Sequence, residues 1–189
     1  MSTLEAAMPT ILKNEGRRVN HKNDPGGDTD FGISLRFLFK TGDHDNDGWQ
    51  DGDINRDNAI SIGDIDSLSE EEATRLYRMY FWEPNHYHLI EDQGIATKCL
   101  DLAVNLGQTL ANKVAQRAIR SALGLTLIED GIMGKKTITA INMCNPATLL
   151  AALKSEAAGQ YRSLVYGKPS FKEFLRGWMN RAYSSPIDV

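Results

Sequence analysis

The chain has 189 residues, of which 41% are hydrophobic and 24% charged, and its formal net charge is −4. This composition is that of an ordinary globular protein, and the length suits one large domain or two small ones. No apolar run approaches the length that spans a membrane, and only two cysteines are present, which excludes a disulfide-rich scaffold.

The first predicted helix ends at Glu15–Gly16, where apolar residues at helical spacing give way to polar ones. Pro9 leaves the start of this helix open, because proline is unfavourable inside a helix. Residues 16–34 are rich in Gly, Asn and Asp, a composition that predicts a loop and a short hairpin. The apolar positions of the helix are Leu4, Met8, Ile11 and Leu12.

An acidic segment follows at residues 43–66, with eight Asp, no Glu and one Arg, a net charge of −7. Because the whole chain carries −4, the remainder carries +3. The acidity therefore belongs to one insert, and a bound cation would relieve its self-repulsion. The insert opens with a run typical of a calcium loop, whose possible ligands are Asp43, Asp45, Asp47 and Asp51. The twelfth position of this first loop is Ile54, so a second ion would need Asp53 or another late carboxylate.

Residues 53–64 place oxygen-bearing side chains at the first, third, fifth, ninth and twelfth positions of a twelve-residue loop, the spacing of an EF-hand-type calcium loop. Asn58 replaces the usual Gly, although Asn tolerates the positive φ required there. The last ligand is an Asp rather than a Glu, as in the loops of dockerin modules. An acidic, solvated surface loop is the alternative interpretation. The expected ligands are Asp53, Asn55, Asp57, Ala59 through its carbonyl, Ser61 and Asp64.

The rest of the chain predicts further helices. Ser69–Glu72 is a capping box that opens a helix running to the Trp82–Pro84 stop. Two stripes of apolar residues at helical spacing predict the next two helices, and a turn follows at residues 130–134. Asn145–Pro146 places a cap and a first-turn proline before a long helix to Gly167. The stripes comprise Ile95, Cys99, Leu102, Ala103 and Leu106, then Val114, Ala118, Ile119 and Leu123.

A second capping box at Ser170–Glu173 predicts the start of the last helix. Cys99 and Cys144 lie in apolar helical patterns and are predicted to be buried thiols.

Arg181 has two possible partners, a substrate carboxylate or a local Glu. The four histidines show no zinc-binding spacing, which argues against a metalloamidase. The aromatic residues Tyr80, Trp82 and Trp178 are predicted to be core residues, with sugar stacking as the alternative.

Glu15 lies where the first helix meets the polar, Gly-rich loop, with Asp24 nine residues later and Thr29 beyond it. This order is similar to that of phage-type lysozymes, in which the Glu protonates a glycosidic oxygen. Such chemistry needs an acid on the leaving-group side and an anion or polarised water near the oxocarbenium-like centre. The alternative is that Glu15 is a helix-terminal surface residue and that Asp24–Gly26 is only a turn.

A resemblance over a larger part of the chain favours the interpretation of Glu15 as a catalytic acid. Residues 14–16, 23–29 and 31–34 together resemble glycoside hydrolase family 108, whose members look like N-acetylmuramidases. Further blocks of resemblance lie at residues 77–82, 101–107, 130–137 and 174–181. The resemblance implies a mainly α-helical, lysozyme-like fold with a small hairpin at the active site. It implies Glu15 as the proton donor, Asp24 and Thr29 as its helpers, a catalytic region at 1–92 and a peptidoglycan-binding region at 93–189.

Two departures from the family pattern stand out: Arg17 and Arg18 replace the usual Gly and aromatic residue, and the acidic insert lies outside the family core. Calcium is therefore expected to be structural or regulatory rather than catalytic. The expected partner is bacterial peptidoglycan, with no nucleic acid and no membrane insertion, and the expected state is a monomer. Rival functions are a lytic transglycosylase and a non-catalytic calcium-dependent binding module. Without a signal peptide, the protein is expected to form in the host cytoplasm and to reach the wall in the periplasm after membrane permeabilisation.

Overall fold

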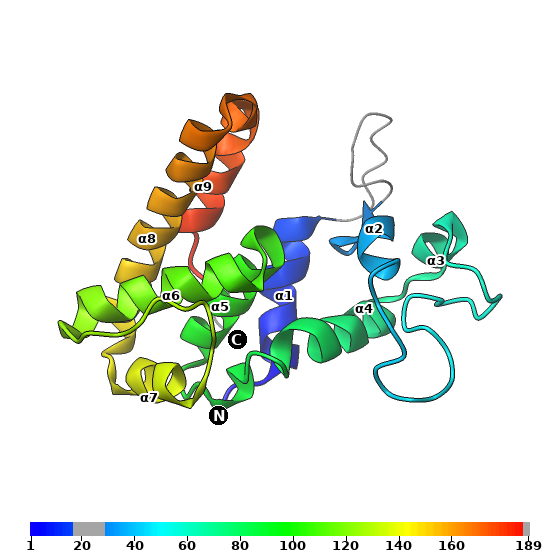
Figure 1. Ribbon diagram of the computed structural model, residues 1–189, viewed down its shortest axis with the longest axis horizontal. Coiled ribbons are helices and arrows are strands. Elements are labelled where there is room, and N and C mark those ends of the chain that lie inside the picture. Colours follow the sequence, from blue (N-terminus) through cyan, green and yellow to red (C-terminus); the bar gives the residue numbers. More distant parts are fainter. Residues whose placement is uncertain (17–28, 187–189) are drawn as a thin grey trace. The chain divides into compact units, whose positions relative to one another are not determined.

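The computed structural model describes residues 1–16 and 29–186 and is mainly helical (Figure 1). Backbone contacts divide the chain into two compact units. One consists of Ile11–Tyr80, and the other joins Met1–Thr10 to Phe81–Val189. The expected division at residue 92 stays a prediction. Among the described residues, no helix combines the length and the apolar character needed to cross a bilayer.

Helix α1 runs from Leu4 to Glu15 and confirms the first predicted helix. It ends because Gly16 adopts a φ of +74°, a left-handed conformation that glycine enters at no steric cost. The Gly16 amide donates to the carbonyl of Leu12 at 3.0 Å, which closes the last turn. Glu15 is therefore held at the last residue of a regular helix.

The described part of the unit of residues 11–80 contains the end of α1, the hairpin, the acidic insert and helices α2, α3 and α4. Ser34 and Ser69 cap two of these helices by accepting hydrogen bonds from the amides of Phe37 and Glu72. The small core of the unit includes Ile11, Phe31, Ile33, Leu38, Ile65, Leu76 and Tyr77. The elements are β1 (Thr29–Asp30), β2 (Ile33–Ser34), α2 (Leu35–Leu38), α3 (Ile62–Ser67) and α4 (Glu70–Tyr77), followed by the π-helix η1 (Arg78–Trp82).

The other unit is a helical bundle in which α8 and α9 run side by side (Figure 1). Both predicted apolar stripes lie mostly in its core, and Cys99 and Cys144 are buried free thiols. Burial raises the pKa of Cys99 to about 12. Its elements are η2 (Tyr87–Leu89), α5 (Gln93–Leu106), α6 (Gln108–Leu123), α7 (Lys135–Met143), α8 (Pro146–Gly167), η3 (Pro169–Phe174) and α9 (Leu175–Tyr183).

The predicted start of the last helix at Ser170 was wrong. Residues Pro169–Phe174 form the 3-10 helix η3, and α9 begins at Leu175 without a side-chain cap. The tight turn brings Phe171 and Phe174 against Trp178, with ring centroids 5.6 and 5.8 Å away. Packing of these aromatic rings explains why the local capping pattern does not start the helix here.

A buried charge cluster ties α5 to α9. Arg181 donates from Nε to Asp101 Oδ1 at 2.9 Å, and its terminal nitrogen lies 2.8 Å from the same oxygen. Lys98 lies 3.6 Å from Asp101 Oδ2 and donates to the carbonyls of Arg181 and Ser184 at 2.6 and 3.2 Å. Desolvation by burial lowers the pKa of Lys98. Arg181 is thus paired with Asp101 rather than with a local Glu, and its predicted contact with a substrate carboxylate stays a prediction.

We expect Asp101→Asn to lower the free energy of unfolding by about 3–5 kcal/mol, because it leaves two buried cations without their counter-charge. Asp101 is 1% exposed, so water cannot replace the carboxylate. Urea denaturation measures the change, with exposed Glu83→Gln as a control that should stay within about 0.5 kcal/mol of the native protein. Equal midpoints for both variants would contradict a role for this cluster in stability.

Candidate active site

Glu15 lies at the end of α1, as predicted, and its side chain is half-buried there. The hairpin forms with Thr29 opposite Ser34 and Asp30 opposite Ile33. Thr29 therefore sits at the open end of the hairpin. Asp24 lies outside the described residues, so its predicted role, like that of Thr29, stays a prediction.

The turn of the hairpin is formed by Phe31 and Gly32, both with positive φ, at +50° and +77°. Two successive positive φ angles are typical of the two-residue turns whose twist suits a hairpin. A bulky residue such as phenylalanine adopts this conformation at a cost, so surrounding contacts must hold it. The Phe31 side chain is buried, and its carbonyl accepts a hydrogen bond from Tyr77 Oη at 2.8 Å.

This turn lies directly against Glu15. A Cβ atom added at Gly32 would lie 2.5 Å from Glu15 Cγ and 2.7 Å from Tyr77 Oη. Contacts below 3.0 Å essentially never occur for a real Cβ, so only glycine fits here without a shift. The hairpin turn and the half-buried side chain of Glu15 are therefore neighbours, although 17 positions separate Glu15 from Gly32 in the sequence.

The first acidic loop gathers Asp43, Asp45 and Asp47, each of which offers an oxygen within 4.8 Å of the others. The Asp47 amide donates to Asp43 Oδ1 and Asp45 Oδ1 at 3.0 and 3.2 Å. The amides of Gly48 and Trp49 donate to Asp43 Oδ2 and Asp47 Oδ1, each at 3.0 Å. The carboxylates thus turn inward and organise the loop around themselves.

The second loop repeats this pattern ten residues later. The Asp57 amide donates to Asp53 Oδ1 and Asn55 Oδ1 at 3.1 and 2.9 Å. The amides of Asn58 and Ala59 donate to Asp53 Oδ2 and Asp57 Oδ1, each at 2.9 Å. Asn58 has a φ of +69°, which fulfils the conformational requirement at the position where EF-hand loops carry glycine. The two Asp clusters are therefore a structural repeat.

Asp64 closes the second loop and begins α3. Its carboxylate accepts hydrogen bonds from the amides of Ser61 at 2.7 Å and Asn55 at 3.2 Å, and its exposure is 0%. Ser61 and Asp64 also form a reciprocal capping box. The last predicted ligand thus lies in the first turn of the exit helix, while Asp53, the first ligand, is buried at the entry.

Asp51 connects the insert to α4 and to η1. It is 4% exposed, and its carboxylate accepts hydrogen bonds from Arg75 at 2.9 Å and Tyr80 Oη at 2.6 Å. Burial and this hydrogen bond raise the pKa of Tyr80 to about 12. A cavity of about 130 Å³ lies beside this pair, lined by residues of both loops and α4, among them Asp45, Asp47, Asp53 and Glu72. Asp51 thus has two partners outside the loop, which the ligand spacing gave no reason to expect.

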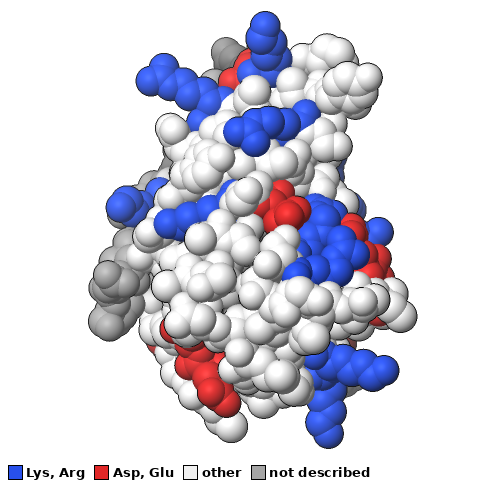
Figure 2. All heavy atoms as spheres, turned by 90° about the vertical axis from the view of Figure 1, so that its left-hand side faces the viewer, with Lys and Arg blue, Asp and Glu red and all other residues white. Residues whose placement is uncertain are grey.

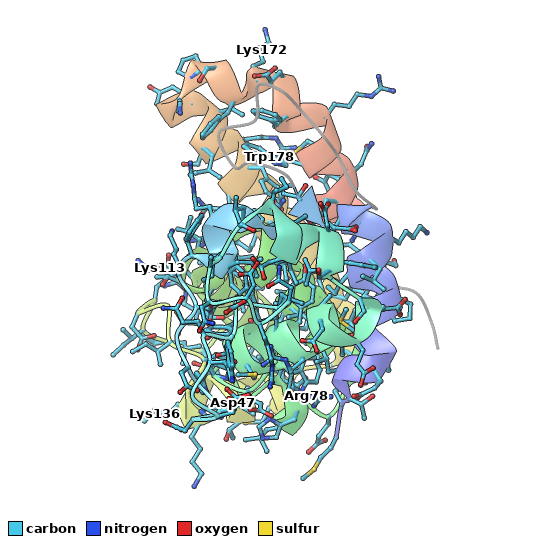
Figure 3. All side chains as sticks on the ribbon, turned by 90° about the vertical axis from the view of Figure 1, so that its right-hand side faces the viewer. Asp47, Arg78, Lys113, Lys136, Lys172 and Trp178 are labelled. Carbon is cyan, nitrogen blue, oxygen red and sulfur yellow. The ribbon has the colours of Figure 1, made fainter. Side chains whose placement is uncertain are left out.

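The unit that contains α5–α9 differs in charge from the insert. Residues 110–183 hold eleven Lys or Arg against four Asp or Glu, a net charge of +7. Figure 2 shows Lys and Arg side chains spread over one face of the molecule. Trp178 lies between α8 and α9 and stacks on Tyr161 with ring centroids 5.3 Å apart, while Lys172 lies at the turn end of the pair (Figure 3). Trp178 is only partly buried, so it is not the core residue that was predicted. Trp82 is 2% exposed and is a core residue as predicted.

Comparison with known protein families shows the family to which the chain belongs. Residues 8–107 match the family model described as Glycosyl hydrolase 108. The chain belongs to this family. It is a glycoside hydrolase that acts on peptidoglycan, since residues 110–183 of the same chain match the model described as Predicted Peptidoglycan domain. No curated protein matches the sequence.

A solved structure, titled "Structure of Brucella abortus SagA", shares the fold of this glycosyl hydrolase with a TM-score of 0.69. The match has 24% sequence identity and covers 95% of this chain and 88% of that one. The fold is therefore the expected mainly α-helical, lysozyme-like one, with a single described β-hairpin that lies beside Glu15.

Proposed function

We propose that this glycoside hydrolase cleaves the β-1,4 bond from N-acetylmuramic acid to N-acetylglucosamine, with Glu15 as the general acid. The observation that supports this role most strongly is the contact between Glu15 and the hairpin turn at Gly32. A half-buried Glu side chain whose Cβ and Cγ pack against the turn has little freedom to move, and proton donation to a leaving-group oxygen requires a well-placed acid.

Asp24 and Thr29 are proposed to assist on the opposite side of the bond. Asp24 would stabilise the oxocarbenium-like transition state or position the attacking water, and Thr29 would hydrogen-bond to it or to the water. Thr29 sits in β1, two residues before the turn that contacts Glu15. A substrate bound along the hairpin would therefore reach both Thr29 and Glu15.

Mass spectrometry of digested peptidoglycan tests the bond and the reaction together. We expect products that end in reducing N-acetylmuramic acid. A lytic transglycosylase acting on the same bond would yield 1,6-anhydro products lighter by one water each. A glucosaminidase would instead leave reducing N-acetylglucosamine. Either of these outcomes would overturn the proposed reaction.

We also propose that the acidic insert binds calcium in a structural or regulatory role. The second loop offers the hard oxygen donors that calcium prefers, from Asp53, Asn55, Asp57, Ser61, Asp64 and the Ala59 carbonyl. Support comes from the inward-facing carboxylates, the buried first and last ligands and the positive φ of Asn58. The first loop repeats this backbone pattern and is proposed to hold a second ion through Asp43, Asp45 and Asp47, with Asp51 divided between the loop and Arg75.

Peptidoglycan carries free carboxylates on its stem peptides, and the region of residues 110–183 carries +7. This complementarity supports the proposal that the helical region holds the wall substrate while the hairpin region cuts it. Such binding should weaken as salt concentration rises, since exposed charges are screened.

A further inference from the structure

Tyr77 is a buried tyrosine whose hydroxyl makes a long-range contact. It lies at the end of α4, its exposure is 1%, and its Oη donates to the Phe31 carbonyl at 2.8 Å across 46 positions of sequence. A phenol in a core is costly unless it is hydrogen-bonded, and phenylalanine fills the same space without that cost. The hydroxyl therefore serves something other than packing.

The hydroxyl, the hairpin turn and Glu15 converge at one point. The Cβ position at Gly32 is 2.7 Å from Tyr77 Oη and 2.5–2.8 Å from Glu15 Cγ and Cβ. No further group fits between these three. Because these atoms are closely packed, a shift of the turn moves the side chain of Glu15 by direct contact.

The backbone conformation of the turn must be stabilised by contacts from outside the hairpin. Phe31 has a φ of +50°, a conformation in which a bulky side chain is strained. Such strain persists only where neighbouring contacts over-determine the backbone. The hydrogen bond from Tyr77 is made to the carbonyl of this same residue, so it fixes the peptide that links Phe31 to Gly32.

We propose that Tyr77 is a positioning residue for the reaction: its hydroxyl fixes the Phe31–Gly32 turn, and the turn fixes the carboxyl group of Glu15. This inference rests on the proposed role of Glu15 as general acid. Tyr77 itself is buried and acts on the substrate only through the turn. It lies on the helix that also carries Arg75, the partner of Asp51 in the insert.

Tyr77→Phe tests this proposal because it removes one oxygen atom and keeps the ring. We expect kcat on soluble peptidoglycan strands to fall by roughly 10- to 100-fold, since small misplacement of a catalytic group has effects of this size. KM should stay within about twofold, because the acid contributes to the transition state rather than to ground-state binding. The matched control is Tyr87→Phe, which removes the hydroxyl of a tyrosine with 0% exposure in the other compact unit.

A melting curve of each variant separates positioning from stability. The proposal is supported if Tyr77→Phe loses kcat while its melting temperature falls no further than that of Tyr87→Phe. It is overturned if Tyr77→Phe keeps native kcat, or if both variants lose activity in proportion to their loss of stability. Should Tyr77→Phe fail to fold, Gly32→Ala provides the second test, because its Cβ displaces the same turn from Glu15, and native kcat in that variant would also overturn the proposal.

Glu15→Gln measured in parallel distinguishes failure of this inference from failure of the proposed function. If Glu15→Gln is inactive while Tyr77→Phe is fully active, only the role of Tyr77 is lost. If Glu15→Gln is as active as the native enzyme, Glu15 is not the acid and the inference falls with it.

Discussion

Glu15→Gln should lose bacteriolytic activity by about 10²- to 10⁴-fold, the range that general acid catalysis contributes. Glutamine has nearly the same shape, but its amide is far too weak an acid to protonate the glycosidic oxygen. The amide still fits beneath the hairpin turn, so Gly32 and Tyr77 keep their positions. The loss should therefore appear in kcat, with substrate affinity and melting temperature close to those of the native enzyme.

The matched control is Glu5→Gln, the same substitution in the first turn of the same helix. Turbidity loss of Gram-negative cells stripped of their outer membrane measures both variants. Glu5→Gln should lyse these cells at the native rate. A folded Glu15→Gln protein with near-native lysis would remove the assignment of the general acid.

Removal of calcium should produce the second large effect, on stability. A ligand that binds only the folded state stabilises it by about 2.7 kcal/mol when its free concentration is roughly a hundredfold above its Kd. The insert carries −7, so without a cation it is also destabilised by self-repulsion. We expect a chelator to lower the melting temperature and the lysis rate, and added calcium to restore both.

Asp53→Asn provides the site-specific form of this experiment. It removes the charge of the buried first ligand and keeps one of its two oxygens, so one of the two hydrogen bonds from the loop amides can still form. The control is Asp66→Asn, which makes the same charge change at an exposed residue near the end of α3, outside the loop. Asp53→Asn should lose the response of the melting temperature to calcium, and Asp66→Asn should keep it. Identical responses in the two variants, or no response in the native protein, would show that the second loop is not a calcium site.

Much of the fold follows from local signals. Asn145 and Pro146 begin α8 and Gly167 ends it, as their cap and first-turn preferences predict. Gly16 ends α1 for the same kind of local reason. Ser170 carries an equally good local pattern but lies in the 3-10 helix η3 and does not begin an α-helix, because the rings of Phe171 and Phe174 pack against Trp178. A local pattern therefore predicts an element only where tertiary contacts do not compete with it.

In the candidate site, too, some residues can be predicted from local sequence and others only from tertiary contacts. Glu15 is recognisable because its helix end, the following Gly-rich loop and the resemblance to a known family coincide at one residue. The contribution of Tyr77 is invisible in the sequence, since its partner is 46 positions away and no residue spacing links the two. Arg75 and Tyr80 reach Asp51 across 24 and 29 positions, which ligand spacing within a single loop does not reveal.

The most direct test of the central claim is the identity of the new chain ends released from purified peptidoglycan by the native enzyme and by Glu15→Gln. The native enzyme should release products that terminate in reducing N-acetylmuramic acid, and Glu15→Gln should release almost none in the same time. Anhydro ends, reducing N-acetylglucosamine ends, or equal product from the two proteins would contradict a muramidase that uses Glu15 as its acid.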